Sequence, residues 1–436
     1  MERTYAAQVR GADCVKVCGF VENIRNKRTM AFIVLKDISG KVQVTVEKGE
    51  NPELDAAVDR ITLDSVITVT GKAVENEYVK LGGVEVLAKE IVLESVAAAL
   101  PIDREERKGH ERSSIDQRID YRWIDLRTDT NQMMFKVQTE LIRAMRDFLL
   151  ERGFLEIHSP KLIGAASESG ADVFAVQYFD RKAYLAQSPQ FYKQMAMASG
   201  LERIFEVGPV FRAEKSFTSK HTTEFSGFDL EFSYIESFRD VMKLEEELLA
   251  CALAAVKEKY GEQLEQVFGM PLQVPTTPFP VIALRDLYDE LEREFGYTVP
   301  EEEKGDLTTE AEHLSYDWVK KKYGHEFLFV TDFDAEKRAF YHMRDENGVP
   351  QGYDLIWRGV EITTGAQREH RYDQLKAQAD EKGLAEDVKF YLEFFKYGCP
   401  PHGGFGLGID RLTMLLLGLT IKEAMFIFRG PNRLNP

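Results

Sequence analysis

Short runs of alternating hydrophobic and polar residues characterise the N-terminal part of the chain. Turn-like segments such as ISG, VTGK and LGG separate most of these runs, which cover residues 15–21, 30–37, 41–47, 65–74 and 84–93. Five short strands within about 85 residues predict a small closed β-barrel of the oligonucleotide-binding (OB) type. Other small β-barrels give a similar pattern, so the pattern alone leaves the type of barrel open.

The spacing of hydrophobic residues becomes helical at about residue 119. Before this point, the charged segment PIDREERKGHERSSIDQR begins with a proline and predicts a hinge between domains. After it, FKVQTELIRAMRDFLLERG predicts a helix that ends at Gly153, and a long helix is expected from about Phe238 to Tyr260. We therefore predict an OB-type domain over residues 1–98, a linker over 99–118 and a second domain over 119–436.

The second domain is expected to have an α+β fold. Its candidate strands include FLEIHSP and several hairpins, and hairpins favour a mainly antiparallel sheet flanked by helices over a sheet built from βαβ units. The last unit, GGFGLGIDRLTMLLLGL, predicts a glycine-rich strand that runs into an apolar helix.

Composition limits the classes of function. The net charge of −17 argues against indiscriminate nucleic-acid binding. Residues 1–100 contain 13 Lys and Arg against 15 Asp and Glu, so nearly all of the excess acid lies beyond them and a local basic patch in the barrel remains compatible with an RNA partner. No apolar run is long enough to cross a bilayer, and the chain is expected in the cytoplasm. The four cysteines support neither a zinc site nor a disulfide framework.

The segment FRAE, at residues 211–214, is followed by a polar loop and a returning strand, FSGFDLEFSYI. Residues two apart on a strand share a face, so Arg212 and Glu214 are expected opposite Asp229 and Glu231 on one floor. A salt-bridged sheet surface would explain any single pair of these residues. The neighbouring loop favours a binding site, because it offers groups that suit a phosphate and a flat base: Lys220, His221 and Phe225.

A second segment, AQSPQFYKQ, predicts the start of a helix. Ser188 is a good N-cap and Pro189 a good first residue, so Gln190 and Lys193 should emerge on one helical face. A helix start with a nearby lysine can hold an anion. A surface helix with ordinary Lys and Gln residues is the competing interpretation.

Two further segments carry candidate chemistry. If Arg358 and Gly359 form a hairpin turn, Asp354 and Glu361 lie on one side of the hairpin and together favour Mg²⁺. The segment HGGFGLGIDR lets a ligand approach the backbone, with Arg411 at the start of the next helix. Ordinary surface carboxylates and a tight helix–strand contact are the alternatives.

In this order, these segments resemble the class II aminoacyl-tRNA synthetases, and within them the aspartyl branch of the compact archaeal and eukaryotic type. GFLEIHSPKL resembles motif 1, the dimer-interface element; FRAE with its HTTEF return resembles motif 2; GGFGLGIDR resembles motif 3. The segments AQSPQFYKQ and GVEITTGAQREHR narrow the likeness to the aspartyl branch. The resemblance covers nearly the whole chain.

The resemblance implies a set of roles. Two arginines would be catalytic: Arg212 and Arg411. The residues that would bind ATP are Arg212, Glu214, Lys220, His221, Phe225, Glu361, Gly408 and Arg411. Those that would bind aspartate are Ser167, Glu168, Gln190, Lys193, Asp229, Thr364 and Arg368. The Mg²⁺ ligands would be Asp354, Glu361 and Thr364, and the anticodon would be read near Arg25, Phe32 and Gln43. The implied partners are ATP, L-aspartate, tRNA(Asp) and a second copy of the chain, with no membrane.

Three positions depart from the family's pattern. Thr364 stands where many relatives carry serine, and Lys220 replaces an arginine and loses a bidentate phosphate contact. Glu22 stands where tRNA(Asp)-restricted archaeal relatives carry tryptophan, which leaves open whether tRNA(Asn) is also a substrate.

Two other functions remain in view. An asparaginyl-tRNA synthetase shares the fold and the ATP site, but two cations, Lys193 and Arg368, favour a carboxylate over a neutral amide in the side-chain pocket. A nucleic-acid-binding paralogue with an inactive catalytic domain is the non-enzyme alternative. The set of charged residues in the four segments speaks against it.

Overall fold

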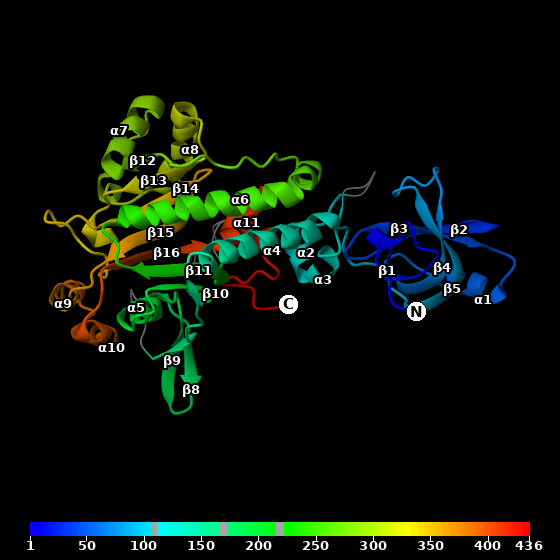
Figure 1. Ribbon diagram of the computed structural model, residues 1–436, viewed down its shortest axis with the longest axis horizontal. Helices are drawn as coiled ribbons and strands as arrows, with labels where there is room; N and C mark the ends of the chain where they lie inside the picture. Colours follow the sequence, from blue (N-terminus) through cyan, green and yellow to red (C-terminus); the bar gives the residue numbers. More distant parts are fainter. Residues whose placement is uncertain (106–110, 165–171, 215–221) are drawn as a thin grey trace. The chain divides into compact units, whose positions relative to one another are not determined.

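The computed structural model describes residues 1–105, 111–164, 172–214 and 222–436. Contacts divide the chain into two compact units, Met1–Ser113 and Ser114–Pro436. Both are drawn in Figure 1 and each is described by itself. Four residues with predicted roles lie outside the described residues: Ser167, Glu168, Lys220 and His221.

The first unit is a closed barrel with the strand order β1-β2-β3-β5-β4, which confirms the predicted five-stranded OB-type fold. Its elements are η1 (Ala6–Gln8), β1 (Cys14–Asn26), β2 (Met30–Lys36), β3 (Lys41–Glu47), α1 (Pro52–Asp59), β4 (Val66–Glu75) and β5 (Val84–Ser95). Alternate residues of the strands fill the interior, as a period of two requires. The short helix α1 is not apparent from the strand pattern. Asn51 caps it by accepting hydrogen bonds from the backbone of Glu53 and Leu54.

The second unit is built on an eight-stranded sheet with the order β12-β13-β14-β15-β16-β11-β10-β6. Within this sheet, as far as its strands are described, only the outermost pairs are parallel, β12 with β13 and β10 with β6, so the sheet is mainly antiparallel as predicted. The strands are β6 (Leu155–Glu156), β10 (Arg203–Phe211), β11 (Glu224–Ser233), β12 (Val281–Ala283), β13 (Phe327–Thr331), β14 (Gly352–Trp357), β15 (Val360–Arg368) and β16 (His402–Gly408). A smaller sheet contains β7 (Leu162–Ile163), β9 (Arg181–Leu185) and β8 (Ala175–Tyr178).

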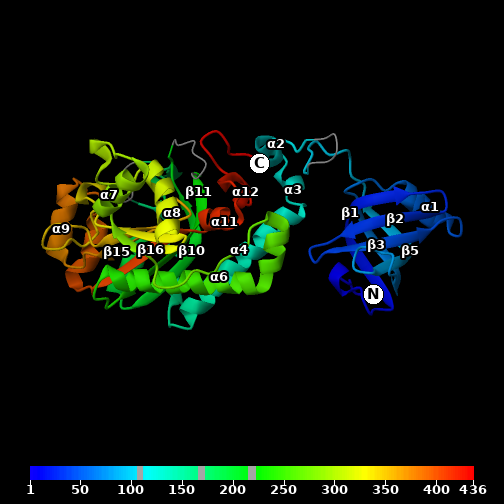
Figure 2. The same cartoon turned by 90° about the horizontal axis from the view of Figure 1, so that it is seen from above.

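Helices α4 and α6 run side by side along one side of the large sheet (Figure 2), and their apolar faces form the main core with the strands behind them. The long helix expected from Phe238 extends to Phe268, and the helix before Gly153 begins earlier than predicted, at Asp129. The helices of this unit are α2 (Ile115–Asp120), α3 (Arg122–Asp125), α4 (Asp129–Leu150), α5 (Gln190–Ala198), α6 (Phe238–Phe268), α7 (Leu284–Phe295), η2 (Glu301–Glu303), α8 (Thr309–Tyr323), η3 (Ala335–Lys337), α9 (Tyr372–Glu381), α10 (Lys389–Glu393), η4 (Phe394–Tyr397), α11 (Ile409–Leu417) and α12 (Ile421–Ala424).

The glycines of β16 let this strand lie unusually close to its neighbours. A Cβ atom at Gly404 would lie 2.1 Å from the carbonyl oxygen of Leu230, and one at Gly403 would lie 2.6 Å from that of Ala366. Strand β16 runs directly into α11, as the glycine-rich sequence predicts. The close approach brings the segments that resemble motifs 2 and 3 together in the centre of the sheet.

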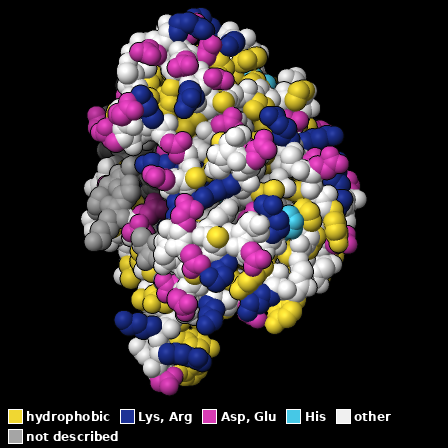
Figure 3. All heavy atoms as spheres, turned by 90° about the vertical axis from the view of Figure 1, so that its left-hand side faces the viewer, with side chains coloured by type: hydrophobic (Ala, Val, Ile, Leu, Met, Phe, Trp, Pro, Cys, Tyr) yellow, Lys and Arg dark blue, Asp and Glu magenta, His cyan; other side chains and the backbone are white. Residues whose placement is uncertain are grey.

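None of the described helices is both long and apolar enough to span a membrane. On the face drawn in Figure 3, Lys and Arg side chains are interspersed with Asp and Glu side chains. Both signs of charge therefore occur side by side on this surface, although the chain as a whole is acidic.

Candidate active site

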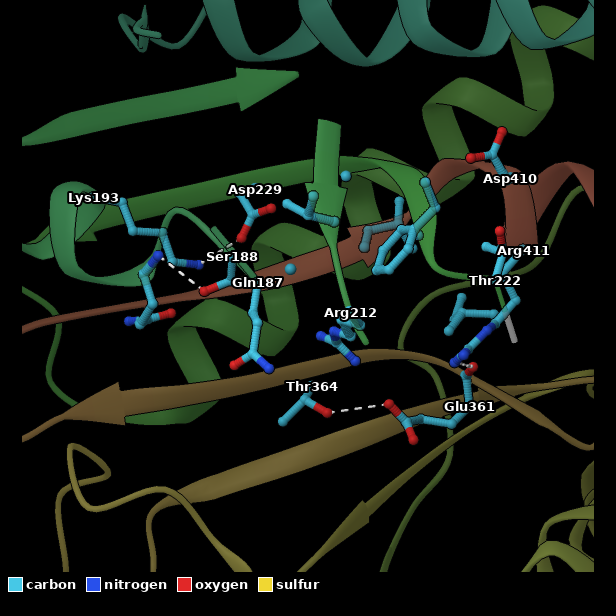
Figure 4. Close-up of a pocket in the computed structure, with 18 of the residues that line it drawn as sticks. Gln187, Ser188, Lys193, Arg212, Thr222, Asp229, Glu361, Thr364, Asp410 and Arg411 are labelled. Atoms are coloured by element: carbon cyan, nitrogen blue, oxygen red, sulfur yellow. Dashed lines mark hydrogen bonds and ion pairs between the residues drawn. The ribbon is translucent and has the colours of Figure 1, made fainter. Parts of the chain in front are cut away.

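A cavity of about 210 Å³ lies on the side of the large sheet that faces away from α4 and α6. Side chains alternate along a strand, so Asp229 points into the cavity while its neighbours Phe228 and Leu230 pack in the main core. Figure 4 places Lys193 and Asp229 at one end of the cavity, Glu361 and Arg411 at the other, and Arg212 between them.

Twelve residues with predicted roles are described in this unit, and eleven of them line the cavity. These are Gln190, Lys193, Arg212, Glu214, Phe225, Asp229, Glu361, Thr364, Arg368, Gly408 and Arg411. Asp354 lies behind the cavity wall, as described below. The fold thus brings together segments that are up to about two hundred residues apart.

The end of the cavity at Lys193, which we call the amino-acid end after the role expected from the sequence, holds two buried cations and two buried carboxylates. The ammonium of Lys193 donates to Asp229 Oδ1 (3.0 Å) and to the carbonyl of Phe405 (3.0 Å), and lies 3.4 Å from Glu231 Oε2. The guanidinium of Arg368 donates through Nε to Glu231 Oε1 (2.9 Å) and through Nη2 to the carbonyl of Gly404 (2.8 Å). Glu231 therefore links Lys193 and Arg368 in one cluster.

The two carboxylates of this cluster titrate differently. Burial raises the pKa of Asp229, and Lys193 offsets this only in part. Burial acts in the same direction on Glu231, but Arg368 and Lys193 outweigh it and the pKa of Glu231 is lowered. Glu231 therefore stays ionised and holds both cations in place, whereas Asp229 is available to a second cation.

Helix α5 positions Lys193 and Gln190. The hydroxyl of Ser188 accepts a hydrogen bond from the backbone N–H of Gln190 (3.1 Å), which is the capping contact expected from the sequence. The helix is assigned from Gln190, one residue later than the predicted start at Pro189. Both Gln190 and Lys193 face the cavity.

The expected floor of Arg212 and Glu214 opposite Asp229 and Glu231 is wrong in its register. Strand β10 ends at Phe211, so Arg212 and Glu214 lie beyond it, and the residue that faces Asp229 across the strand pair is Glu206. Arg212 and Glu214 still line the cavity. The strand pattern placed these residues in the sheet because it does not reveal where β10 leaves its partner.

Arg212 lies among groups that suit a nucleotide. Its guanidinium is 5.4 Å from the centroid of the Phe225 ring, and its Nη1 is 3.9 Å from Glu214 Oε1. The backbone N–H of Arg212 donates to the carbonyl of Thr223, which fixes the end of the motif 2 hairpin. A flat aromatic face, a cation and a carboxylate thus lie together at the middle of the cavity.

The β14–β15 hairpin supplies the acidic end. Arg358 (φ 49°) and Gly359 (φ 76°) form its turn, and Glu361 faces Ile356, as the sequence predicts. The register then shifts by one residue, so that Asp354 faces Thr364. The shift is invisible in the sequence, and it brings the Thr364 hydroxyl 2.9 Å from Asp354 Oδ1 and 3.2 Å from Glu361 Oε1.

Asp354 is held by a residue that the sequence did not single out. Arg338 donates to both of its carboxylate oxygens, at 2.9 and 2.6 Å. Burial raises the pKa of Asp354 to about 6, the nearby Glu361 adds to the rise, and Arg338 opposes it. Arg338 follows η3 in an irregular connection, where no periodic pattern marks it as part of a site.

The two carboxylates of this hairpin, Asp354 and Glu361, fit a divalent cation that is shared with a substrate. Glu361 and Thr364 line the cavity, and Asp354 supports them from behind. Across the described ranges, no group of three or more His, Cys, Asp or Glu side chains could hold a metal ion. A cation here would need further oxygen ligands, and phosphate oxygens are what Mg²⁺ usually recruits.

Arg411 closes the same end of the cavity from the first turn of α11. Its Nη1 donates to the carbonyl oxygen of Glu361 (2.7 Å), which links motif 3 to the acidic hairpin. Gly408 leaves the cavity wall open beside it. Arg411 and Glu361 therefore place a cation and a carboxylate beside each other in the wall at the acidic end of the cavity.

The three barrel residues with predicted roles lie on β1, β2 and β3. Arg25 and Phe32 face each other across β1 and β2, with the guanidinium 5.5 Å from the ring centroid. The Gln43 amide donates to Glu85 (3.0 Å) and to Thr45 (3.3 Å). All three side chains are at least partly exposed, so they are available to a partner.

Glu22, the position at which the sequence left the choice of tRNA open, is part of the same barrel unit. It pairs with Lys41 at 2.6 Å, and both side chains are partly exposed. A charged pair at this position cannot offer the stacking surface of an indole ring.

Comparisons with known proteins agree with this geometry. Residues 114–428 match the family described as tRNA synthetases class II (D, K and N), and residues 15–94 match the OB-fold nucleic acid binding domain. The chain is 41% identical to aspartate--tRNA(Asp/Asn) ligase of Aeropyrum pernix, over 97% of this chain and 95% of that protein. It is 38% identical to aspartate--tRNA(Asp) ligase of Pyrococcus abyssi, over 97% and 96% of the two chains.

A solved structure, asparaginyl-tRNA synthetase from Pyrococcus horikoshii complexed with asparaginyl-adenylate, superposes with a TM-score of 0.90 at 32% identity and covers 100% of both chains. The family match covers most of the chain, and the fold and the order of the motifs agree with it. The chain belongs to the class II tRNA synthetases of the D, K and N group.

Proposed function

We propose that this synthetase activates L-aspartate with ATP and transfers it to the 3′ end of tRNA(Asp). The observation that carries the choice of amino acid is the pair of buried cations, Lys193 and Arg368, at one end of the cavity. The relatives named as aspartate--tRNA ligases, at 38 to 41% identity, support the same choice.

Arg368 is suited to receive the side-chain carboxylate of aspartate. Glu231 and Gly404 occupy its Nε and Nη2, and within the described part of the chain no hydrogen bond involves its Nη1. Arg368 lines the cavity, so this nitrogen is the donor that it offers to a ligand. Asp229, at the same end, suits the substrate's α-ammonium group.

ATP would occupy the rest of the cavity. Arg212 would bind the α-phosphate, Glu214 would accept a hydrogen bond from the adenine amino group, and Phe225 and Arg411 would lie on the two faces of the adenine. The α-carboxylate of aspartate would attack the α-phosphorus of ATP in line, and pyrophosphate would leave. The 3′-hydroxyl of the tRNA would then attack the adenylate carbonyl and release AMP. No protein nucleophile is needed, so positioning and charge neutralisation supply the catalysis.

Glu361 and Thr364, backed by Asp354, would hold a Mg²⁺ ion together with the ATP phosphates. When bound, the ion neutralises phosphate charge. Arg338 and Thr364 keep Asp354 in place from the protein side, through the contacts described above.

A homodimer in the cytoplasm is the proposed form and place of the enzyme. The segment that resembles the dimer-interface element leaves two large apolar side chains, Leu155 and Leu162, about half exposed at 51% and 50%. Such exposed apolar residues suit a second copy of the chain. The cytoplasm is inferred because ATP and tRNA are available there.

Amino-acid-dependent exchange of labelled pyrophosphate into ATP tests the proposed activation step. Exchange that requires L-aspartate and Mg²⁺, with little exchange on L-asparagine, is the expected result. Asparagine is the second candidate, because the solved structure with a TM-score of 0.90 is an asparaginyl enzyme. Exchange driven by asparagine alone would replace the proposal with that candidate.

A further inference from the structure

Four buried polar side chains form a continuous hydrogen-bond network behind the amino-acid end of the cavity. His402 Nε2 lies 3.0 Å from Gln194 Nε2, and Gln194 Oε1 accepts from Gln190 Nε2 (2.9 Å) and from the hydroxyl of Tyr391 (2.9 Å). The exposed fraction is 0% for His402, Gln194 and Tyr391 and 5% for Gln190. Only Gln190 reaches the cavity wall.

His402, the residue of this network that lies farthest from the cavity, determines which groups donate and which accept. His402 Nδ1 lies 2.8 Å from the carbonyl oxygen of Pro400, which can only accept, so Nδ1 must carry the proton. The sulfur of Cys399 is more distant, at 3.7 Å from the same nitrogen. Burial lowers the pKa of His402 to about 4 and keeps the ring neutral. The other nitrogen, Nε2, is therefore an acceptor.

The acceptor on His402 decides the orientation of both glutamines. Gln194 must turn its amide nitrogen toward His402 Nε2, so its oxygen points the other way, toward Gln190 and Tyr391. Gln190 must then present its own nitrogen to Gln194. Its oxygen is left for the cavity, and no described residue donates a hydrogen bond to it.

We propose that Gln194 and His402 are positioning residues that hold the Gln190 amide with its oxygen toward the cavity, as an acceptor for the substrate's α-ammonium group. The inference rests on the proposed function, because it assumes an amino acid at this end of the cavity. A reversed Gln190 amide would aim an N–H donor at the ammonium donors and would weaken binding. Neither Gln194 nor His402 touches the substrate in this scheme.

The test uses two substitutions at Gln194 in the full-length enzyme. Q194M keeps the length of the side chain and removes its acceptor, so the KM for aspartate in pyrophosphate exchange should rise roughly fivefold or more while the KM for ATP stays unchanged. Q194E keeps acceptor oxygens for Gln190 and Tyr391 and pairs with a protonated His402. It should restore the KM for aspartate to within about twofold of the wild-type value.

Two further variants guard against a general loss of structure. H402F keeps a ring beside Phe395, which stacks on His402 at 6.2 Å, and removes both nitrogens, so it should also raise the KM for aspartate selectively. Q374M makes the same change as Q194M on an exposed position of α9 and should leave both KM values unchanged.

An unchanged KM for aspartate in both Q194M and H402F would overturn the inference. An equal rise in the KM for aspartate and the KM for ATP, without rescue by Q194E, would overturn it as well. Wild-type enzyme that supports no exchange with aspartate would instead overturn the proposed function. The two failures are therefore distinguishable.

Discussion

At the scale of single residues, the amino-acid end of the cavity depends on a balance of buried charges. Lys193, Arg368 and Glu231 are each at most 2% exposed. A buried charge that loses its partner is strongly destabilising, so each of the three requires the others. The same balance leaves Arg368 able to bind one further carboxylate, which is the basis of the proposed specificity.

Replacing Arg368 with leucine should abolish most aspartate activation. The substrate carboxylate would lose its partner, and Glu231 would keep only Lys193. Truncation of a buried charge pair costs about 2–5 kcal/mol, which corresponds to at least a ~30-fold fall in kcat/KM for aspartate. Pyrophosphate exchange measures the effect. R371L is the matched control, since Arg371 pairs with Glu369 and its side chain is 46% exposed. Near-normal aspartate activation in R368L would remove Arg368 from the proposed pocket.

At the scale of secondary-structure elements, α6 carries a buried carboxyl group against the back of the sheet that supports the cavity. Glu245 accepts a hydrogen bond from the hydroxyl of Tyr353 on β14 (2.6 Å), and its burial raises its pKa to about 8. Tyr353 itself packs across Gly365 of β15, where a Cβ atom would lie 2.3 Å from the tyrosine ring. The packing of α6 on the hairpin is therefore sensitive to ionisation of one group.

The stability of the protein should respond to pH through Glu245. Its folded pKa lies above its ordinary value of 4.5, so the folded state binds the proton more tightly and the stabilisation from protonation is lost as pH rises from about 4.5 through about 8. E245Q cannot ionise. Its melting temperature relative to wild type should rise between about pH 6 and about pH 8, by roughly 2 °C or more, and then level off.

Thermal unfolding at several pH values measures this difference. E258Q, at an exposed position of the same helix, should show no such trend. A constant offset between E245Q and wild type across the range would mean that Glu245 does not titrate in this window.

The elements also show what the sequence could predict. The five barrel strands, the antiparallel sheet, the turn at Arg358 and Gly359, and the strand-to-helix junction before Arg411 follow from local patterns, which need only neighbours in the chain. The end of β10, the register shift in β15 and the contact of Arg338 with Asp354 depend on distant partners. Local patterns carry no signal for them, and the orientation of Gln190 is likewise set by residues about two hundred positions away.

At the scale of the whole molecule, the two units divide the proposed work. The catalytic unit would select the amino acid, and the barrel would select the tRNA through partly exposed groups that include Phe32 and Gln43. Single-stranded bases stack on exposed aromatic rings, and a barrel of this type presents such rings on its strands.

Replacing Phe32 with alanine should separate the two activities. Loss of one stacking contact costs about 1–3 kcal/mol, so kcat/KM for tRNA should fall roughly 5- to 150-fold while pyrophosphate exchange is unchanged. Aminoacylation and exchange assays on the same preparation measure both. Y78A removes another exposed aromatic residue of the barrel, 85% exposed, and serves as the control. Equal loss in F32A and Y78A, or a loss of exchange in F32A, would contradict the assignment.

Whether the enzyme charges tRNA(Asp) alone or also tRNA(Asn) is a property of the whole molecule. Relatives of similar identity include enzymes named for both tRNA(Asp) and tRNA(Asn) and enzymes named for tRNA(Asp) alone. In this chain Glu22 pairs with Lys41 at the position where the family resemblance leads us to expect tryptophan in an enzyme restricted to tRNA(Asp). We therefore expect tRNA(Asn) to be accepted as well as tRNA(Asp).

The most direct measurement is the charging of separately purified tRNA(Asp) and tRNA(Asn) with labelled aspartate, with labelled asparagine as the control. The account predicts aspartate on tRNA(Asp), and with the Glu22–Lys41 pair in the barrel it predicts aspartate on tRNA(Asn) too. Aspartate on tRNA(Asp) alone would contradict only the relaxed choice of tRNA. Charging with asparagine and not with aspartate would contradict the central claim that Lys193 and Arg368 select a carboxylate.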